Sequence, residues 1–111
     1  WQDVVLVGFS QGSIMALDAL ASGRYPLAGV VAFSGRLAVE GQLTPQAHVP
    51  ALLIHGQADE VIPWQESESA ATRLRAAGVP VDARFEPATG HTISGPGAMH
   101  AAAFIGQCLQ D

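Results

Sequence analysis

Apolar residues along this chain fall into short blocks whose spacing predicts four strands and three helices. Four runs read as strands because they are short, rich in apolar residues and bounded by turn residues; they cover residues 4–7, 28–33, 50–56 and 79–86. Apolar residues recur at helical spacing in 13–21, 65–77 and 96–110. The segment 35–49 has little periodicity and is expected to be a loop.

The order of these elements predicts an α/β fold with about four parallel strands and crossover helices. The first run is wholly apolar, which is typical of a strand buried on both faces of a parallel sheet. The run 79–86 alternates apolar and polar residues, and this fits a strand near the edge of the sheet.

Composition narrows the class of protein. A chain of 111 residues with 49% hydrophobic content is one globular domain or part of one. A net charge of −5 with five Lys and Arg argues against binding to nucleic acid or to an anionic membrane surface. No apolar run is long enough to span a bilayer. Cys108 is the sole cysteine, so an intrachain disulfide is excluded, and a packed thiol is expected there.

The start of the chain bears on domain organisation. Trp1 stands only a few residues before the first apolar run. Because a native chain seldom opens inside a central buried strand, we expect residues 1–111 to form a partial domain. This domain would be the C-terminal part of a longer protein, with its N-terminal half absent.

The most informative motif is Gly8-Phe9-Ser10-Gln11-Gly12, between the first strand and the first helix. A G-x-S-x-G in this context predicts a nucleophile elbow. The turn is so tight that Ser10 is expected to have a positive φ. Side chains at Gly8 and Gly12 are expected to collide with the neighbouring strand and helix. The alternative is a Gly-rich turn whose serine only caps the helix.

Two further residues follow later strands and complete a set of three. Asp59 comes just after the third strand, and His91 just after the fourth. Functional groups of open α/β sheets gather at the carboxyl ends of the strands, so Ser10, Asp59 and His91 are expected to meet. The chain order Ser, Asp, His is that of α/β-hydrolases.

Each of these residues has a predicted role. A serine hydroxyl needs a base within hydrogen-bond reach, and His91 would accept its proton. Asp59 would hold the imidazole in the required tautomer. The backbone N–H of Gln11 would be one donor of the oxyanion hole. The second donor is expected from a loop after an earlier strand, outside this chain.

Other residues compete for these roles or surround them. Glu60 is the alternative acid beside Asp59. Three further histidines have expected settings: His55 as a packing residue or one behind the site, His48 in a solvated loop, and His100 on the helix surface. Their spacing does not favour a metal site. An acyl or alcohol pocket is predicted from Phe9, Leu37 and Trp64, although Trp64 could simply anchor the start of a helix.

The sequence resembles the phospholipase/carboxylesterase family of α/β-hydrolases, which includes the acyl-protein thioesterases. The matching segments are Gly8–Gly12, Leu27–Gly35, His55–Asp59, Val61–Pro63 and Gly90–Ser94. The resemblance implies the C-terminal half of an α/β-hydrolase fold, with Ser10 as nucleophile, Asp59 as acid and His91 as base. It also implies a cytoplasmic esterase or thioesterase without a cofactor.

The chain departs from the family pattern in three places. The first half, with its His-Gly oxyanion loop, is absent. Ser13 stands where a third small residue, usually glycine, is common after the motif. Thr92 replaces the acidic residue often found after the histidine.

These observations predict a serine hydrolase that acts through an acyl-enzyme. Its substrate would be a small ester or thioester, an acylated protein or a lysophospholipid. The alternatives are a peptidase of the same fold and a catalytically incompetent α/β fragment. The isolated chain is expected to be weakly active at best, because it lacks one oxyanion donor and exposes the edge of its first strand.

Overall fold

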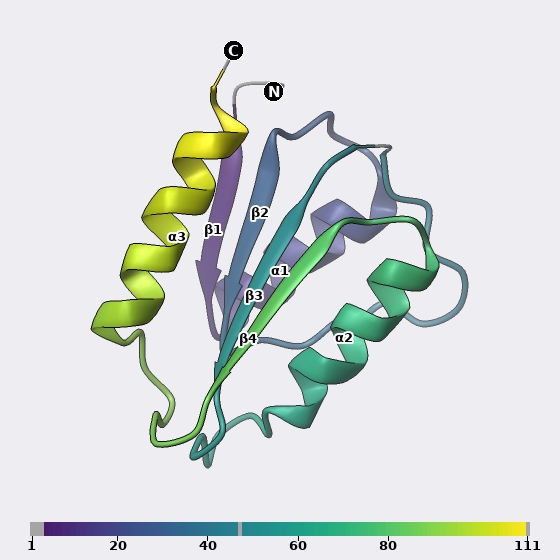
Figure 1. The fold of residues 1–111 in the computed structure, drawn as a ribbon. Coiled ribbons are helices and arrows are strands. Elements are labelled where there is room, and N and C mark those ends of the chain that lie inside the picture. The colour runs from purple at the N-terminus through teal and green to yellow at the C-terminus, as the bar shows by residue number, and fades with distance from the viewer. Residues whose placement is uncertain (1–3, 47, 111) are drawn as a thin grey trace.

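The structure, a computed structural model, describes residues 4–46 and 48–110. Its elements follow in the order β1 (Val5–Phe9), α1 (Gln11–Ser22), β2 (Gly29–Phe33), β3 (Ala51–Gly56), α2 (Gln65–Ala76), β4 (Val81–Glu86) and α3 (Gly95–Cys108). The strands form one parallel sheet in the order β1-β2-β3-β4 (Figure 1). The predicted α/β class and element order are confirmed.

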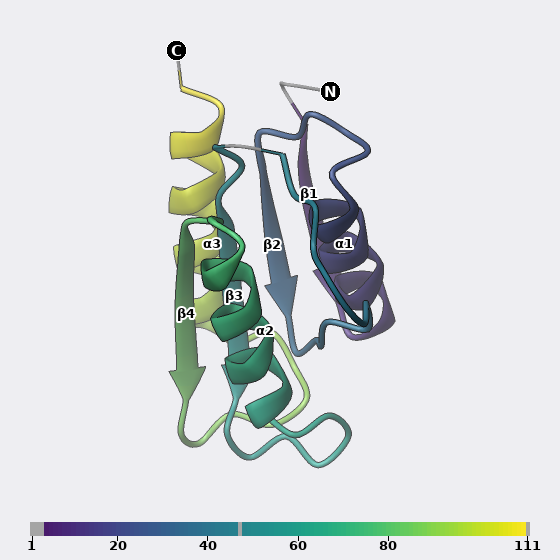
Figure 2. The same cartoon turned by 90° about the vertical axis from the view of Figure 1, so that its right-hand side faces the viewer.

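The molecule has three layers, with the sheet in the middle (Figure 2). Helices α1 and α2 cover one face, and α3 covers the other. Side chains of a strand alternate between its two faces, so Val30 and Ala32 face the α1 and α2 side while Val31 and Phe33 face α3. Both faces of β2 and β3 are buried, which explains their continuous apolar runs.

Strand β1 corrects one prediction. Its side chains are only partly buried, with Val7 53% and Phe9 37% exposed. Burial on both faces is therefore wrong for β1 in the described residues, whereas the expected exposed edge at this strand is confirmed. The physical reason is that β1 is the last strand of this sheet and α3 packs against β2 and β3 instead.

The other edge behaves as predicted. Strand β4 alternates half-buried and exposed side chains, and its exposed Asp82 and Arg84 lie 3.2 Å apart as an ion pair.

The connection from β2 to β3 contains neither helix nor strand in its described part, residues 35–46 and 48–49, while Ala47 lies outside the described residues. Across residues 4–46 and 48–110, no helix has the length and apolar character needed to cross a membrane.

Candidate active site

Ser10 occupies a one-residue turn between β1, which ends at Phe9, and α1, which begins at Gln11. Its φ of 56° and ψ of −117° confirm the predicted strained backbone, which persists only where the surroundings impose it. The Ser10 N–H donates to the carbonyl oxygen of Phe33 at 3.0 Å. The Ser10 carbonyl accepts from the Ser13 N–H at 3.1 Å and from the Ser13 hydroxyl. Neighbouring strand and helix thus hold the turn from both sides.

The two glycines of the motif differ in what they require. A Cβ on Gly8 would lie 2.3 Å from the carbonyl carbon of Gly12, so the predicted collision is confirmed there. A Cβ on Gly12 would meet no described atom within 4 Å, and the prediction is wrong at that position. The reason is that Gly12 lines an open apolar groove of about 380 Å³, with Val7 and Met15, on the exposed side of β1.

The loops after β3 and β4 are joined backbone to backbone. The Gln57 N–H donates to the Glu86 carbonyl at 2.8 Å, and the Ala58 N–H donates to the Thr89 carbonyl at 2.9 Å. Gly56 permits this approach, because a Cβ there would lie 2.0 Å from the Thr89 oxygen. The pairing brings the loop of Asp59 beside the loop of His91.

We therefore expect Gly56→Ala to separate the two loops. Overpacking of this kind typically costs about 1–3 kcal/mol of stability. Thermal denaturation measures this effect. Gly106→Ala is the matched control, since a Cβ at Gly106 in α3 meets nothing within 4 Å. Equal stability of the two variants would contradict this account.

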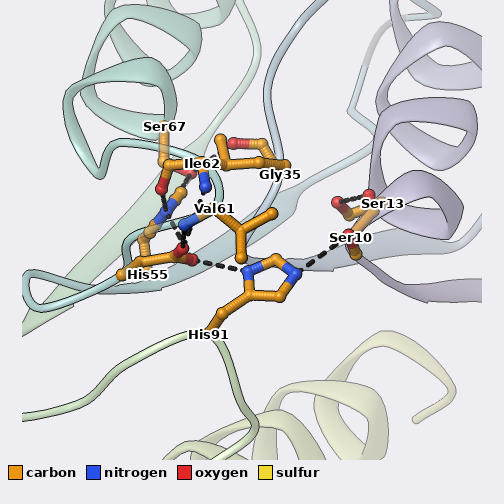
Figure 3. A network of polar contacts seen from close by, with 9 residues as sticks. Ser10, Ser13, Gly35, His55, Val61, Ile62, Ser67 and His91 are labelled. Atoms are coloured by element: carbon orange, nitrogen blue, oxygen red, sulfur yellow. Dashed lines mark hydrogen bonds and ion pairs between the residues drawn. The ribbon is translucent and has the colours of Figure 1, made fainter.

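His91 forms a hydrogen bond with Ser10 on one side of its ring and with Asp59 on the other. Figure 3 shows the His91 ring with its contact to Ser10. Asp59 Oδ2 is 2.7 Å from His91 Nδ1, and His91 Nε2 is 3.0 Å from Ser10 Oγ. A carboxylate accepts hydrogen bonds, so Nδ1 carries the proton that faces Asp59. In the neutral imidazole, Nε2 then has a free lone pair to accept the Ser10 proton. The structure brings together all three residues that the sequence singled out.

The surroundings of His91 fix its ring. Phe9 packs against the imidazole with ring centroids 4.8 Å apart and planes tilted by 45°. Ser94, the N-cap of α3, accepts from the Gly97 N–H at 2.9 Å and donates its hydroxyl proton to the Glu86 carboxylate. The loop that carries His91 is thus tied at its far end to the end of β4.

Asp59 is a buried carboxylate surrounded by donors. Its side chain is 0% exposed, and its Oδ1 accepts from the N–H groups of Val61 at 2.8 Å and Ile62 at 2.9 Å. Burial raises its pKa, but the hydrogen bonds from His91, Ile62 and Val61 outweigh burial and leave the pKa below its ordinary value of 3.8. Glu60 is exposed, so the contact with His91 belongs to Asp59 rather than to its alternative.

The lowered pKa of Asp59 has a consequence for acid stability. The unfolded chain binds the Asp59 proton at a higher pH than the folded chain does. The ionised Asp59 carboxylate therefore contributes fully to the free energy of unfolding above the pKa that it has in the unfolded chain. As pH falls through the lower folded pKa, this contribution is lost. We expect the free energy of unfolding, measured with urea from about pH 5 to about pH 3, to fall less steeply with pH for Asp59→Asn than for wild type. Asp18→Asn, an exposed aspartate of α1, is the control; identical slopes for Asp59→Asn and wild type would contradict the prediction.

The predicted pocket residues have different settings. Phe9 contacts His91 as described, whereas Leu37 packs against the larger core cluster. Trp64 directly precedes α2 and packs on Phe85 with ring centroids 5.2 Å apart, which supports the alternative in which it anchors the start of the helix. Gln11 is the first residue of α1, and the role of its N–H stays a prediction.

The remaining candidates lie apart from the site, with one exception. His48 and His100 are exposed, as expected. Cys108 is half-buried, and burial raises the pKa of its thiol. Within residues 4–46 and 48–110, no three His, Cys, Asp or Glu side chains gather as a metal site would require.

His55 is the one of these candidates that contacts the site. Its Nε2 lies 3.2 Å from Asp59 Oδ2. Sequence reasoning placed His55 behind the site without revealing this contact.

Comparison with known proteins identifies the group that this chain resembles. A family model described as Phospholipase/Carboxylesterase matches residues 1–109. The crystal structure of esterase PE8 is 37% identical, with a TM-score of 0.85 over 95% of this chain and 50% of that protein. The structure of SOBER1 from Arabidopsis thaliana is 25% identical, with a TM-score of 0.87 over 98% of this chain and 54% of that protein.

One relative carries a different description. A protein of Oryza sativa subsp. japonica described as a "Probable inactive carboxylesterase" is 32% identical over 83% of this chain and 40% of its own length. The chain therefore spans between two fifths and about half of the relatives that it matches.

Proposed function

The chain belongs to the phospholipase/carboxylesterase family of α/β-hydrolases, and we propose that it is a serine hydrolase of carboxylic esters or thioesters. The observation that carries this proposal is the position of His91 between Asp59 and Ser10, with contacts of 2.7 and 3.0 Å. This is the arrangement of nucleophile, base and orienting acid that acyl transfer needs.

The proposed reaction has two halves. Ser10 Oγ attacks the acyl carbon while His91 Nε2 takes the hydroxyl proton, and the carbonyl oxygen becomes an oxyanion. Collapse of this intermediate breaks the bond to the leaving group, which departs with the proton from His91. The acyl group remains on Ser10. A water molecule, deprotonated by His91, then attacks the acyl carbon, and the acid leaves as Ser10 recovers its proton.

The turn geometry supports a place for the oxyanion. Ser10 precedes the N-terminus of α1, where backbone N–H groups point outward and the helix dipole favours negative charge. The N–H of Gln11 is the donor proposed on this side. Asp59 stabilises the imidazolium that forms on His91 during each half of the reaction.

The whole protein's activity is part of the proposal. The relatives are about twice as long as this chain, and we expect the active protein to include a segment that supplies a second oxyanion donor. Loss of one such donor typically costs about 10²- to 10³-fold in rate. The isolated chain should therefore hydrolyse p-nitrophenyl acetate more slowly than the complete gene product by at least about that factor. Equal rates would contradict this expectation.

A fluorophosphonate probe tests the proposed function directly. We expect the probe to label Ser10 in the complete gene product, as located by mass spectrometry of the peptide. Absence of labelling would favour the catalytically incompetent alternative, as in the relative described as inactive. A labelled enzyme that cleaves amides faster than esters would favour the peptidase alternative. Short-chain esters, a lysophospholipid and a palmitoyl thioester then separate the substrate classes.

A further inference from the structure

His55 is a buried histidine that the proposed reaction does not use. It lies at the carboxyl end of β3 and is 0% exposed. Its Nδ1 is 2.6 Å from Ser67 Oγ in α2, and its Nε2 is 2.7 Å from the Ile62 carbonyl oxygen (Figure 3). Its Nε2 also lies 3.2 Å from Asp59 Oδ2. Both ring nitrogens therefore have polar partners in the protein interior.

The partners of Nε2 determine where His55 carries its proton. The carbonyl oxygen of Ile62 can only accept a hydrogen bond, and an ionised Asp59 carboxylate can only accept as well. Nε2 must therefore be protonated, whether or not Nδ1 is. This N–H donates to the Ile62 carbonyl, and Nε2 also lies 3.2 Å from Oδ2, the oxygen of Asp59 that accepts from His91.

The loop that carries Asp59 is held from outside mainly at its start. The Gln57 and Ala58 N–H groups join the start of the loop to the end of β4 and the loop after it. The hydrogen bonds from Val61 and Ile62 to Asp59 Oδ1 lie within the loop, so they fix its shape but not its place against the sheet. Residues 60 and 61 are exposed, so little packing holds this later part of the loop. His55 stands on a buried strand and reaches the middle of the loop.

We propose that His55 is a positioning residue for the reaction proposed above: its Nε2–H holds the Asp59 loop so that Oδ2 stays aligned with His91 Nδ1. The inference rests on the proposed function for its kinetic part only. Asp59 Oδ2 accepts from His91 at 2.7 Å and has the His55 imidazole beside it, with Nε2 at 3.2 Å.

Further buried contacts connect the His55 side chain with the turn that carries Ser10. Ser67 Oγ lies 3.0 Å from the carbonyl oxygen of Gly35. Gly35 in turn abuts Ser13, since a Cβ on Gly35 would lie 2.0 Å from Ser13 Oγ. The Ser13 hydroxyl donates to the carbonyl of Ser10. His55 and Ser67 thus connect the Asp59 loop with the structure around Ser10 through buried contacts.

Two substitutions separate positioning from mere packing. A glutamine at position 55 can place its amide N–H where Nε2 lies and donate to Ile62, whereas an asparagine reaches only as far as Nδ1 and its contact with Ser67. We expect His55→Gln to retain most of kcat. We expect His55→Asn to lower kcat about 10- to 100-fold with little change in KM, because a misplacement of about 1 Å costs about 10²-fold.

The measurements are made on the complete gene product, with rates expressed per fluorophosphonate-labelled site so that unfolded molecules do not count. A second readout is the NMR signal of the His91 Nδ1 proton, which requires no turnover. It should persist in His55→Gln and weaken in His55→Asn. His100→Asn, at an exposed position of α3, is the control and should change neither readout.

The possible outcomes distinguish a failure of the positioning role of His55 from a failure of the proposed function. A His91 Nδ1 signal that is unchanged in folded His55→Asn would overturn the positioning role, as would equal kcat per labelled site in wild type and His55→Asn. The positioning role would also be overturned if kcat fell equally in His55→Gln and His55→Asn and the fall matched only the loss of folded protein. An inactive wild type with the predicted NMR pattern would leave positioning intact and refute the proposed function instead.

Discussion

Replacing Ser10 with alanine is expected to lower kcat for p-nitrophenyl acetate by about 10⁵- to 10⁶-fold in the complete gene product, since removal of a nucleophilic serine elsewhere costs about that much. The strained φ of 56° at Ser10 already accommodates a Cβ, so the substitution removes only the hydroxyl. The fold and the loops of Asp59 and His91 should therefore be unchanged.

Steady-state kinetics and circular dichroism together measure this prediction. The matched control is Ser69→Ala, because Ser69 is an exposed serine of α2, and it should retain wild-type kcat. A Ser10→Ala protein that keeps most of its activity while remaining folded would show that another residue is the nucleophile.

The second large effect is expected for Asp59→Asn, with kcat lower by about 10⁴-fold, the cost of the corresponding change in a serine protease. The backbone donors around the side chain determine which way the asparagine amide is turned. Oδ1 accepts from two backbone N–H groups, of Val61 and Ile62, so the amide oxygen must take that place. The amide NH₂ then faces His91 Nδ1.

An NH₂ group at this position donates where a carboxylate accepted. His91 would have to carry its proton on Nε2, which then could not accept the Ser10 proton. We expect the tautomer change to appear in ¹⁵N NMR of His91 together with the loss of kcat. Glu60→Gln is the control, because Glu60 is exposed and adjacent in sequence. A larger loss in Glu60→Gln than in Asp59→Asn would assign the acid to Glu60.

Much of this fold was predictable from periodicity. The buried strands β2 and β3 are continuous apolar runs, and the edge strand β4 alternates. The meeting of Ser10, Asp59 and His91 was also predictable, because all three follow strands of one parallel sheet and so come to the same edge. The apolar periodicity of the strands and the common edge of a parallel sheet are sufficient to predict these features.

What the sequence could not predict depends on neighbours in space. Val7 and Gly12 were expected to be enclosed, but the side of β1 on which they lie is open in the described residues. The contact of His55 with Asp59 depends on how the intervening loop turns back on β3. Ser67 reads as an ordinary helix residue, and only the packing of α2 brings it to His55.

Trapping the acyl-enzyme tests the central proposal most directly. The complete gene product is mixed with p-nitrophenyl acetate, quenched in acid during turnover and digested for mass spectrometry. We predict one acetyl group on the peptide that contains Ser10, and none on that peptide in the Ser10→Ala protein. Turnover with no acetyl group on Ser10, or with the acetyl group on another residue, would contradict the proposal that Ser10 is the nucleophile.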